Sequence, residues 1–280
     1  MTDQYAVIGH PIAHSKSPLI HQMFAEQTGQ DIRYTAIESP LDGFAAAIER
    51  LRKAGYKGCN VTVPFKFEAF QLAQHNLSDR AQVAKAVNTL KFNDGAILGD
   101  NTDGVGLVAD IENNFGVPLQ GKHTLLMGAG GAAWGVALPL MQRGARITIV
   151  NRTEDKAVEL AQFLQRSIFA DPSVQHQRPG FVRSYSELAE MKFDLVINAT
   201  SSGLSNDLAP LPDGIFAPNA LAYDMMYGRE TPFMKFARAQ GAQVADGLGM
   251  LVEQAAEAFY VWRGVRPDTA PIIAALRPTL

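Results

Sequence analysis

The segment Gly128-Ala-Gly130-Gly131-Ala-Ala133 constrains the fold of this chain more than any other stretch. It fits the pattern G-x-G-x-x-A, follows an apolar run at 123–127 that predicts a strand, and opens a helical pattern that continues to Gln142. Glycines at such a turn let backbone N–H groups approach a pyrophosphate, and the positive end of the helix adds attraction. The pattern therefore predicts a dinucleotide site in a doubly wound α/β domain. The alternative is a tight strand-to-helix turn without a ligand.

The residues after the next predicted strand, at 146–150, indicate which dinucleotide is bound. About twenty residues after the glycine turn, an NAD enzyme usually carries an acid that binds the ribose 2′-hydroxyl. This chain has Asn151-Arg152-Thr153 and then Lys156 at that place. A guanidinium and an ammonium would bind a 2′-phosphate, so NADP is favoured over NAD. The alternative is a solvated helix start, although cations there oppose the helix dipole.

Further strand patterns complete this C-terminal unit. They lie at 193–198, 221–225 and 242–245, with a weak strand near 181–183 that follows a loop at 171–180. The last two helical patterns, at 250–262 and 267–276, have no strand after them. We therefore expect these two helices to pack back on the first domain.

The N-terminal half of the chain predicts a second α/β unit. Apolar runs and helical patterns alternate there as βαβαβ, at 5–9, 18–28, 33–37, 41–54 and 58–63. This order implies a parallel sheet covered by helices. An Asn93-Asp94-Gly95 turn between apolar runs at 88–92 and 96–98 predicts a hairpin beside that sheet.

Length and composition limit the class of protein. The 280 residues suffice for two domains, and 47% hydrophobic against 19% charged residues is typical of a globular chain. The net charge of -3 and the scattered cations give no footprint for nucleic acid. No signal or membrane-spanning pattern appears, and the single Cys59 fits a reducing compartment, so we expect a cytoplasmic protein without a membrane partner. The histidines lack metal-ligand spacing, so no metal is expected.

One carboxylate stands out at the junction of the two halves. It is Asp103, within Gly99-Asp-Asn-Thr-Asp-Gly-Val-Gly106. Because ligand sites favour crevices between domains, we expect Asp103 to face Lys66 across a cleft. Lys66 stands just beyond a proline that ends the strand at 58–63. From its context alone, such a lysine is equally well a solvated surface residue.

Small polar residues gather at other predicted strand ends. Ser15 and Ser17 flank a single residue, so their hydroxyls point the same way beside a helix N-terminus, which suits a carboxylate. Ser17 is equally well explained as the N-cap of that helix. Asn60 and Thr62 alternate at the end of one strand, and Asn88 opens another. Such amides and hydroxyls suit a substrate with sugar-like hydroxyls.

Nine signatures, in order, resemble the shikimate dehydrogenase family, and the likeness runs from residue 6 to about 265. They are HSKSP (14–18), NVTVPFK (60–66), AVNT (86–89), GDNTDGVG (99–106), GAGGAA (128–133), NRT (151–153), INATSSG (197–203), DMMYG (224–228) and DGLGMLVEQA (246–255). One departure is visible, because the family commonly has a small or polar residue and then arginine where this chain has Ala133-Trp134.

The resemblance implies NADP-dependent, reversible reduction of 3-dehydroshikimate to shikimate, a step toward chorismate and the aromatic amino acids. It implies that Lys66 transfers a proton and works with Asp103, and that Ser15 and Ser17 hold the substrate carboxylate. The residues implied to hold ring hydroxyls are Thr62, Asn88, Asp103, Tyr227 and Gln254. The residues implied to lie along NADP are Asp79, Gly128, Ala129, Gly130, Gly131, Ala132, Asn151, Arg152, Thr153, Lys156, Met225 and Gly247.

The same resemblance implies the domain organisation. An N-terminal α/β substrate domain with a mostly parallel sheet is expected at 1–104, completed by C-terminal helices at 248–280, and a Rossmann-like NADP domain is expected at 105–247. A monomer or homodimer is expected.

Two rival functions remain. A quinate/shikimate dehydrogenase that accepts NAD is disfavoured by the cations at 152 and 156. A non-catalytic NADP-binding regulator of the same fold would have lost Lys66 or Asp103, and this chain retains both.

Overall fold

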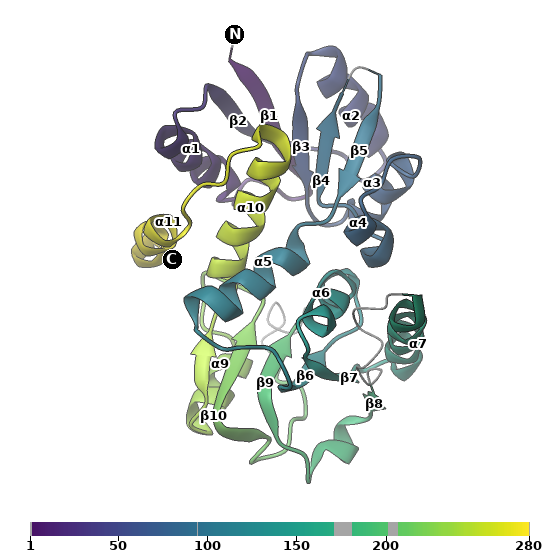
Figure 1. The fold of residues 1–280 in the computed structure, drawn as a ribbon, viewed down its shortest axis with the longest axis vertical. Helices are drawn as coiled ribbons and strands as arrows, with labels where there is room; N and C mark the ends of the chain where they lie inside the picture. The colour runs from purple at the N-terminus through teal and green to yellow at the C-terminus, as the bar shows by residue number, and fades with distance from the viewer. Residues whose placement is uncertain (1, 94, 171–180, 201–206, 280) are drawn as a thin grey trace. The chain divides into compact units, whose positions relative to one another are not determined.

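The computed structural model describes residues 2–93, 95–170, 181–200 and 207–279. The chain forms two compact units, the first from Met1–Gly106 with Leu251–Leu276 and the second from Leu107–Met250 with Arg277–Leu280. Both units are α/β, as the sequence predicts (Figure 1). The loop expected at 171–180, Asp94 of the hairpin turn and residues 201–203 of the INATSSG signature lie outside the described residues.

The sheet of the first unit has five strands in the order β2-β1-β3-β4-β5. Strands β1, β2 and β3 are parallel, whereas β4 is antiparallel to both β3 and β5. The predicted βαβαβ order and the hairpin are therefore confirmed. The strands are β1 (Asp3–Gly9), β2 (Ile32–Glu38), β3 (Gly58–Val61), β4 (Thr89–Phe92) and β5 (Ile97–Asp100).

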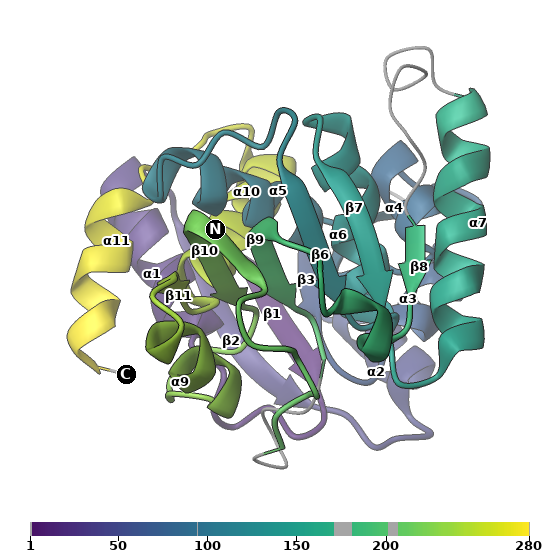
Figure 2. The ribbon, with the colours of Figure 1, turned by 90° about the horizontal axis from the view of Figure 1, so that it is seen from below.

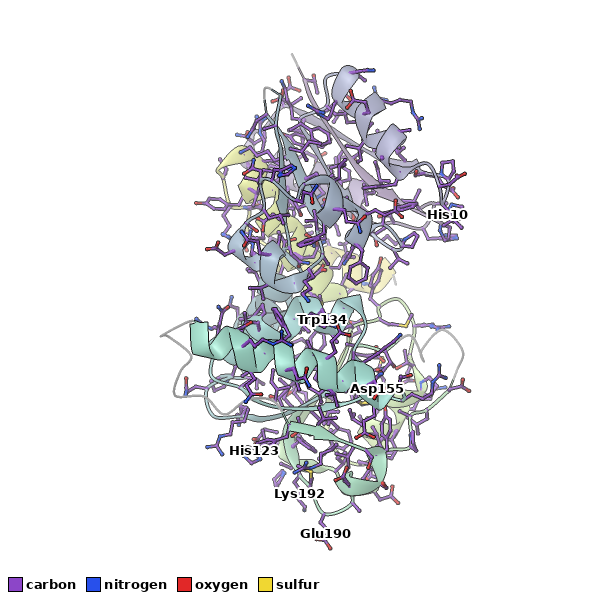
Figure 3. The ribbon with its side chains drawn as sticks, turned by 90° about the vertical axis from the view of Figure 1, so that its right-hand side faces the viewer. His10, His123, Trp134, Asp155, Glu190 and Lys192 are labelled. Carbon is purple, nitrogen blue, oxygen red and sulfur yellow. The ribbon has the colours of Figure 1, made fainter. Side chains whose placement is uncertain are left out.

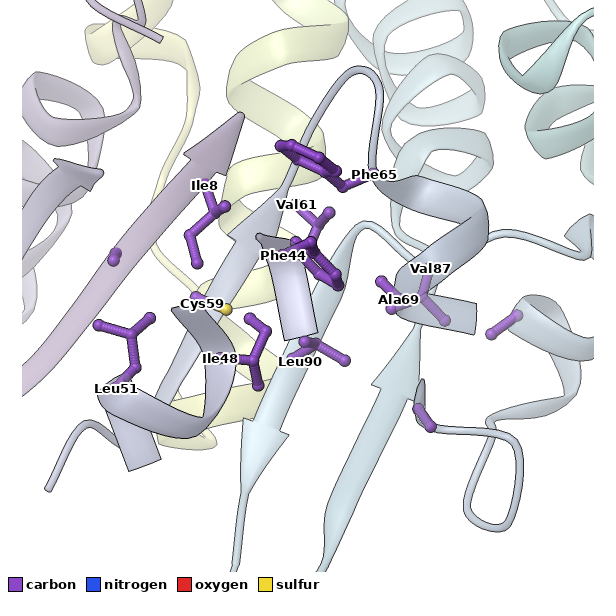
Figure 4. Packing of buried hydrophobic residues seen from close by; sticks show 13 residues of the cluster. Ile8, Phe44, Ile48, Leu51, Cys59, Val61, Phe65, Ala69, Val87 and Leu90 are labelled. Atoms are coloured by element: carbon purple, nitrogen blue, oxygen red, sulfur yellow. The ribbon is translucent and has the colours of Figure 1, made fainter. Parts of the chain in front are cut away.

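Alternate strand residues face opposite sides of this sheet. On one side, Ala6, Ile8 and Cys59 pack with residues of helices α2 (Phe44–Lys53) and α3 (Lys66–Leu72). Figure 4 shows Ile8 and Cys59 beside Phe44 and Ile48 of α2. On the other side, Tyr5 stacks on Trp262 of helix α10 (Leu248–Arg263), with ring centroids 4.7 Å apart. Most of α10 and helix α11 (Ala270–Leu276) thus belong to the first unit.

Helix α1 (Ser17–Thr28) begins one residue earlier than predicted. Lys16 takes the N-cap position without a side-chain cap, and its carbonyl accepts a hydrogen bond from the Ile20 N–H at 3.1 Å. Pro18 lies in the first turn. Backbone N–H groups in the first turn have no partner within the helix, so the missing N–H of proline costs no helical hydrogen bond there. The capping interpretation of Ser17 is therefore wrong, and helix capping does not account for its hydroxyl.

The sheet of the second unit has six parallel strands in the order β11-β10-β9-β6-β7-β8. Helices α6 (Gly131–Gln142) and α7 (Glu154–Ala170) lie over β6, β7 and β8, and α9 (Pro232–Ala239) packs on β10 and β11 (Figure 2). The order in which strands are added reverses between β6 and β9, so a ligand crevice is expected at their carboxyl ends. The strands are β6 (His123–Met127), β7 (Arg146–Val150), β8 (Phe181–Arg183), β9 (Phe193–Asn198), β10 (Phe216–Asp224) and β11 (Gln243–Ala245).

No helix in the described part of the chain combines the length and the apolar character that crossing a membrane requires. Within the same ranges, no group of three or more His, Cys, Asp or Glu residues could hold a metal ion. Cys59 is a free thiol buried in the apolar core of the first unit.

Candidate active site and cofactor site

Lys66 and Asp103 meet in the first unit. Each is the first residue of a helix, Lys66 of α3 and Asp103 of α5 (Asp103–Ala109), and these helices follow β3 and β5. Because β3 and β5 run in the same direction, both helices begin at one edge of the sheet. Lys66 Nζ lies 2.6 Å from Asp103 Oδ2, and the side chains are 23% and 10% exposed. The two residues that the sequence singled out thus form a partly buried ion pair.

A side-chain amide holds the second oxygen of the Asp103 carboxylate. Asn88 Nδ2 donates to Asp103 Oδ1 at 2.8 Å and to Thr102 Oγ1 at 3.0 Å, while Asn88 Oδ1 accepts from the Thr102 N–H at 2.9 Å. Gln254 Oε1 on α10 lies 3.4 Å from both Asn88 Nδ2 and Thr102 Oγ1. Asn88, Asp103 and Gln254 therefore form one polar cluster, and Thr102 is a member that the sequence reading missed.

The remaining polar candidates of the first unit follow β1 and β3, which are parallel. Ser15 and Ser17 lie after β1, and the Ser15 hydroxyl accepts a hydrogen bond from the Ser17 N–H at 3.3 Å. Thr62 directly follows β3, and its N–H donates to the Ile8 carbonyl at 2.9 Å. A Cβ on Gly9 would lie 2.4 Å from the Thr62 methyl group, so glycine is required for this approach. Two strand ends thus bring the serines and Thr62 to one edge of the sheet.

Asn60 differs from the other candidates because both ends of its amide are used inside the protein. Its Oδ1 accepts from the Tyr34 hydroxyl at 2.7 Å, and its Nδ2 donates to Thr89 Oγ1 at 3.1 Å and to the Asn88 carbonyl at 3.2 Å. These contacts suit a residue that holds the Asn88 backbone in place. The Tyr34 contact joins residues of different strands, and no local sequence pattern signals it.

The glycine turn of the second unit opens into a pocket of about 810 Å³. Gly128 has φ of +108°, which L side chains rarely adopt, and its missing Cβ would approach the Ala199 carbonyl to 3.1 Å. Gly130 is the extended N-cap of α6, and a Cβ there would meet nothing within 4 Å. Bare backbone thus faces open space at a helix N-terminus, which fits a pyrophosphate.

The sequence-predicted cofactor residues of both segments, 128–132 and 151–156, line this one pocket. Arg152 and Lys156, the cations expected to select NADP, are exposed there. Asn151 Nδ2 donates to the Thr153 carbonyl at 2.7 Å and closes the turn that presents them. The glycine turn and the two cations thus face the same space.

The pocket also contains residues that the sequence reading missed. They are Ser184, Tyr185, Ala199, Thr200, Asp207, Leu208, Ala209 and Pro210. Of these, Ala199 and Thr200 could have been predicted from the sequence, because they directly follow β9 at the point where the strand order reverses.

Four further candidates lie outside this pocket. Asp79 is the exposed first residue of helix α4 (Asp79–Ala84) in the first unit. Met225 directly follows β10, and a Cβ on Gly247 would lie 2.3 Å from its carbonyl oxygen, so these two residues are neighbours in the second unit. Tyr227, two residues after Met225, is half-buried, and burial raises the pKa of its hydroxyl.

Known proteins resemble the chain over its whole length. Family models for the shikimate dehydrogenase substrate binding domain, shikimate / quinate 5-dehydrogenase and the shikimate 5'-dehydrogenase C-terminal domain match residues 7–90, 110–204 and 247–277. Shikimate dehydrogenase (NADP(+)) from Methylobacillus flagellatus is 59% identical over 98% of this chain and 99% of its own length. The chain belongs to the shikimate dehydrogenase family.

Solved structures agree with this membership. Shikimate 5-dehydrogenase from Thermus thermophilus, in complex with NADP(H) and shikimate, is 33% identical over 100% of both chains, with a TM-score of 0.86. An Ael1 enzyme from Pseudomonas putida is 48% identical over 98% of both chains, with a TM-score of 0.88. The expected fold class, with an N-terminal substrate domain and a Rossmann-like NADP domain, is confirmed by these neighbours.

The departure from the shikimate dehydrogenase pattern at Ala133-Trp134 lies in helix packing. Ala133 is fully buried, and the Trp134 ring of α6 lies against Phe163 of α7 with centroids 5.0 Å apart. Trp134 is labelled in Figure 3. Trp134 is not among the described residues that line the glycine-turn pocket. Trp134 therefore packs α6 against α7, and it does not belong to the lining of the pocket at the glycine turn.

Proposed function

We propose that this chain catalyses the NADP-dependent, reversible reduction of 3-dehydroshikimate to shikimate, with Lys66 and Asp103 as its catalytic pair. The activity and the cofactor are those of relatives named shikimate dehydrogenase (NADP(+)) that match nearly the whole chain. The observation that carries the assignment of the pair is the 2.6 Å contact between Lys66 Nζ and Asp103 Oδ2 within a cluster of amides and hydroxyls.

The chemistry assigned to this pair is proton transfer. When bound, NADPH supplies the hydride that converts the ketone carbon into a secondary alcohol carbon. The Lys66 ammonium donates a proton to the ketone oxygen as negative charge develops there, and Lys66 accepts that proton in the reverse direction. Asp103 keeps Nζ in place, and Asn88 in turn fixes the Asp103 carboxylate. The pair therefore both supplies the proton and stabilises the developing charge.

Substrate recognition is assigned to the polar edge of the first unit. Ser15 and Ser17 hold the substrate carboxylate, and Thr62, Asn88, Asp103 and Gln254 hold the ring hydroxyls. Tyr227, a residue of the second unit, is a further candidate for these hydroxyls that rests on the family resemblance alone. Asn60 supports this set from within the sheet, because its three internal partners occupy both ends of its amide. We assign residues 1–104 and 248–280 to the substrate domain.

NADP binding is assigned to residues 105–247. The backbone from Gly128 to Ala132 receives the pyrophosphate, and Asn151, Arg152, Thr153 and Lys156 receive the 2′-phosphate end. The support is the open space at Gly130 and the two exposed cations at the pocket. Asp79, Met225 and Gly247 are further candidates along the cofactor, resting on the family resemblance.

The first test is shikimate-dependent formation of NADPH, followed by absorbance. We expect Lys66→Ala to lower turnover by at least about a hundredfold, the usual effect of removing a positioned acid or base. Lys53→Ala is a matched control, because Lys53 is the exposed last residue of α2 and lies outside the polar cluster. Near-normal turnover of purified, folded Lys66→Ala would overturn the assignment.

Two rival functions give different results in the same assay. A quinate/shikimate dehydrogenase would use quinate and NAD at rates comparable with shikimate and NADP, and the exposed cations Arg152 and Lys156 favour NADP instead. A non-catalytic regulator would bind NADPH tightly without turnover, and the intact Lys66–Asp103 pair favours an enzyme.

The remaining expectations about partners and location are also proposals. The Thermus thermophilus relative is in complex with small molecules, and the net charge of -3 supports the absence of a nucleic-acid partner. We infer a cytoplasmic protein without a membrane partner that is a monomer or homodimer. Cell fractionation and light scattering after gel filtration test these points.

A further inference from the structure

Arg80 lies outside the catalytic pair, yet it joins three elements of the first unit. It stands in α4, and its guanidinium donates from Nε and Nη2 to the two oxygens of Asp100, both at 2.6 Å. Its Nη1 donates to Glu257 Oε1 of α10 at 2.7 Å. The side chains of Asp100 and Glu257 are only 5% and 8% exposed. One guanidinium therefore pairs with two buried carboxylates that come from β5 and α10.

Asp100 is linked to Asp103 by a short chain of hydrogen bonds. Asp100 Oδ1 accepts from the Asn101 N–H at 2.7 Å, and Asn101 Oδ1 accepts from the Asp103 N–H at 3.1 Å. The Asn101 amide also donates to the Ala86 carbonyl at 3.0 Å. Because Asp100 is fixed by two parallel bonds from Arg80, the backbone that enters α5 has a defined position.

Glu257 is linked to the polar cluster in another way. It follows Gln254 by one helical turn on α10, so both side chains project from the same face of that helix. Gln254 lies 3.4 Å from Asn88 Nδ2 and Thr102 Oγ1. The bond from Arg80 to Glu257 therefore fixes the rotation of the helix face that carries Gln254.

We propose that Arg80 is a positioning residue, which holds the Asp100–Asp103 loop and the Gln254 face of α10 in register so that Asp103 meets Lys66. This inference rests on the proposed function of that pair. Burial alone would raise the pKa of Asp100, but Arg80, with help from Ser78 and Asn101, holds it below its usual range. The Asp100 anion that Arg80 pairs with is thus maintained at neutral pH.

The chain offers a matched control for this role. Arg266 bonds the other oxygen of Glu257, but it has no bond to Asp100 within the described residues, and its side chain is 51% exposed. Arg80→Met and Arg266→Met both remove a guanidinium from Glu257. Only Arg80→Met also releases the loop that leads to Asp103.

The test compares steady-state kinetics of the wild-type protein, Arg80→Met, Arg80→Lys and Arg266→Met, with melting temperatures recorded for each. We expect Arg80→Met to lower kcat/KM for shikimate at least about tenfold, with KM for NADP unchanged within about twofold. Lysine keeps the charge but cannot donate two parallel bonds, so Arg80→Lys should recover only part of the loss. Arg266→Met should stay within about threefold of the wild-type protein.

The inference is overturned if folded Arg80→Met keeps kcat/KM for shikimate within about twofold, or if KM for NADP rises as much as KM for shikimate. If Arg80→Met does not fold, Arg80→Lys decides, and wild-type kinetics in that variant overturn the inference. Absence of shikimate-dependent activity in the wild-type protein would instead contradict the proposed function, which separates the two failures.

Discussion

At the scale of single residues, His21 is a buried titratable group that the proposed chemistry does not use. It is fully buried in α1, and its ring stacks on Tyr34 with centroids 4.1 Å apart. Within the described ranges, neither ring nitrogen has a hydrogen-bond partner of good geometry. Burial lowers the pKa of His21 to about 3, and the nearby Asn60 amide opposes this shift only in part.

This environment predicts a pH-dependent stability. Above about pH 6.5 His21 is neutral in both the folded and unfolded states. Between that pH and about 3 the unfolded state binds a proton that the folded state excludes. The free energy of unfolding should therefore fall with falling pH, by up to about 1.4 kcal/mol per pH unit from this group.

The substitution His21→Phe should reduce that slope, because phenylalanine keeps the stacked ring and removes the titration. Urea unfolding at a series of pH values from about 7, above the unfolded-state pKa, to about 5, below it, measures the slope in the wild-type protein and in the variant. His75→Phe, the same replacement at an exposed position, is the control for the change of residue type. Equal slopes in the wild-type protein and His21→Phe would contradict the prediction.

At the scale of elements, Gly106 sets how closely α5 approaches α10. A Cβ on Gly106 would lie 2.7 Å from both the backbone nitrogen and the Cβ of Gln254. Helix propensity favours alanine over glycine by about 1 kcal/mol, but overpacking typically costs about 1–3 kcal/mol. The overpacking should dominate here, because the clash involves backbone that cannot rotate away.

We therefore expect Gly106→Ala to destabilise the chain by about 1 kcal/mol or more and to raise KM for shikimate through displacement of Gln254. Urea unfolding and initial rates measure the two effects. A variant that is more stable than the wild-type protein would mean that the two helices can separate without loss.

The elements also divide into those that local patterns predict and those that they do not. The strand at 181–183 and the hairpin of β4 and β5 were predicted correctly, because periodicity and turn residues are local signals. The start of α1 was placed wrongly, because Ser17 fits an N-cap by type but Lys16 takes that position. Local propensity could not separate these two neighbouring residues.

At the scale of the whole molecule, the site is built from contacts between distant parts of the sequence. The pairing of Lys66 with Asp103 could be predicted only because each stood in a recognisable motif. Arg80 contacts Glu257 across 177 positions, and neither residue stands out in the sequence. Such contacts follow from sheet order and helix packing, which a reading of local patterns does not supply.

Cofactor selectivity should appear in the stability of the whole chain. NADP at about a hundred times its Kd should raise the free energy of unfolding by about 2.7 kcal/mol. The shift in melting temperature with NADP and with NAD, at equal concentrations, measures this stabilisation. Arg152→Ala should reduce the shift that NADP causes and leave the shift that NAD causes unchanged. Lys192→Ala is the control, since Lys192 is exposed and does not line the pocket. Equal shifts from both dinucleotides would contradict the selection of NADP.

The division of the chain has a consequence for its synthesis. Residues 107–250 form the second unit and emerge from the ribosome before Leu251–Leu276, which the first unit requires. Until residues 251–276 have emerged, Tyr5 lacks the Trp262 ring that covers it, and Asn88 lacks Gln254. The first unit is thus completed only after the second has been synthesised, and the nascent chain must keep that apolar sheet face from aggregating until α10 and α11 have emerged.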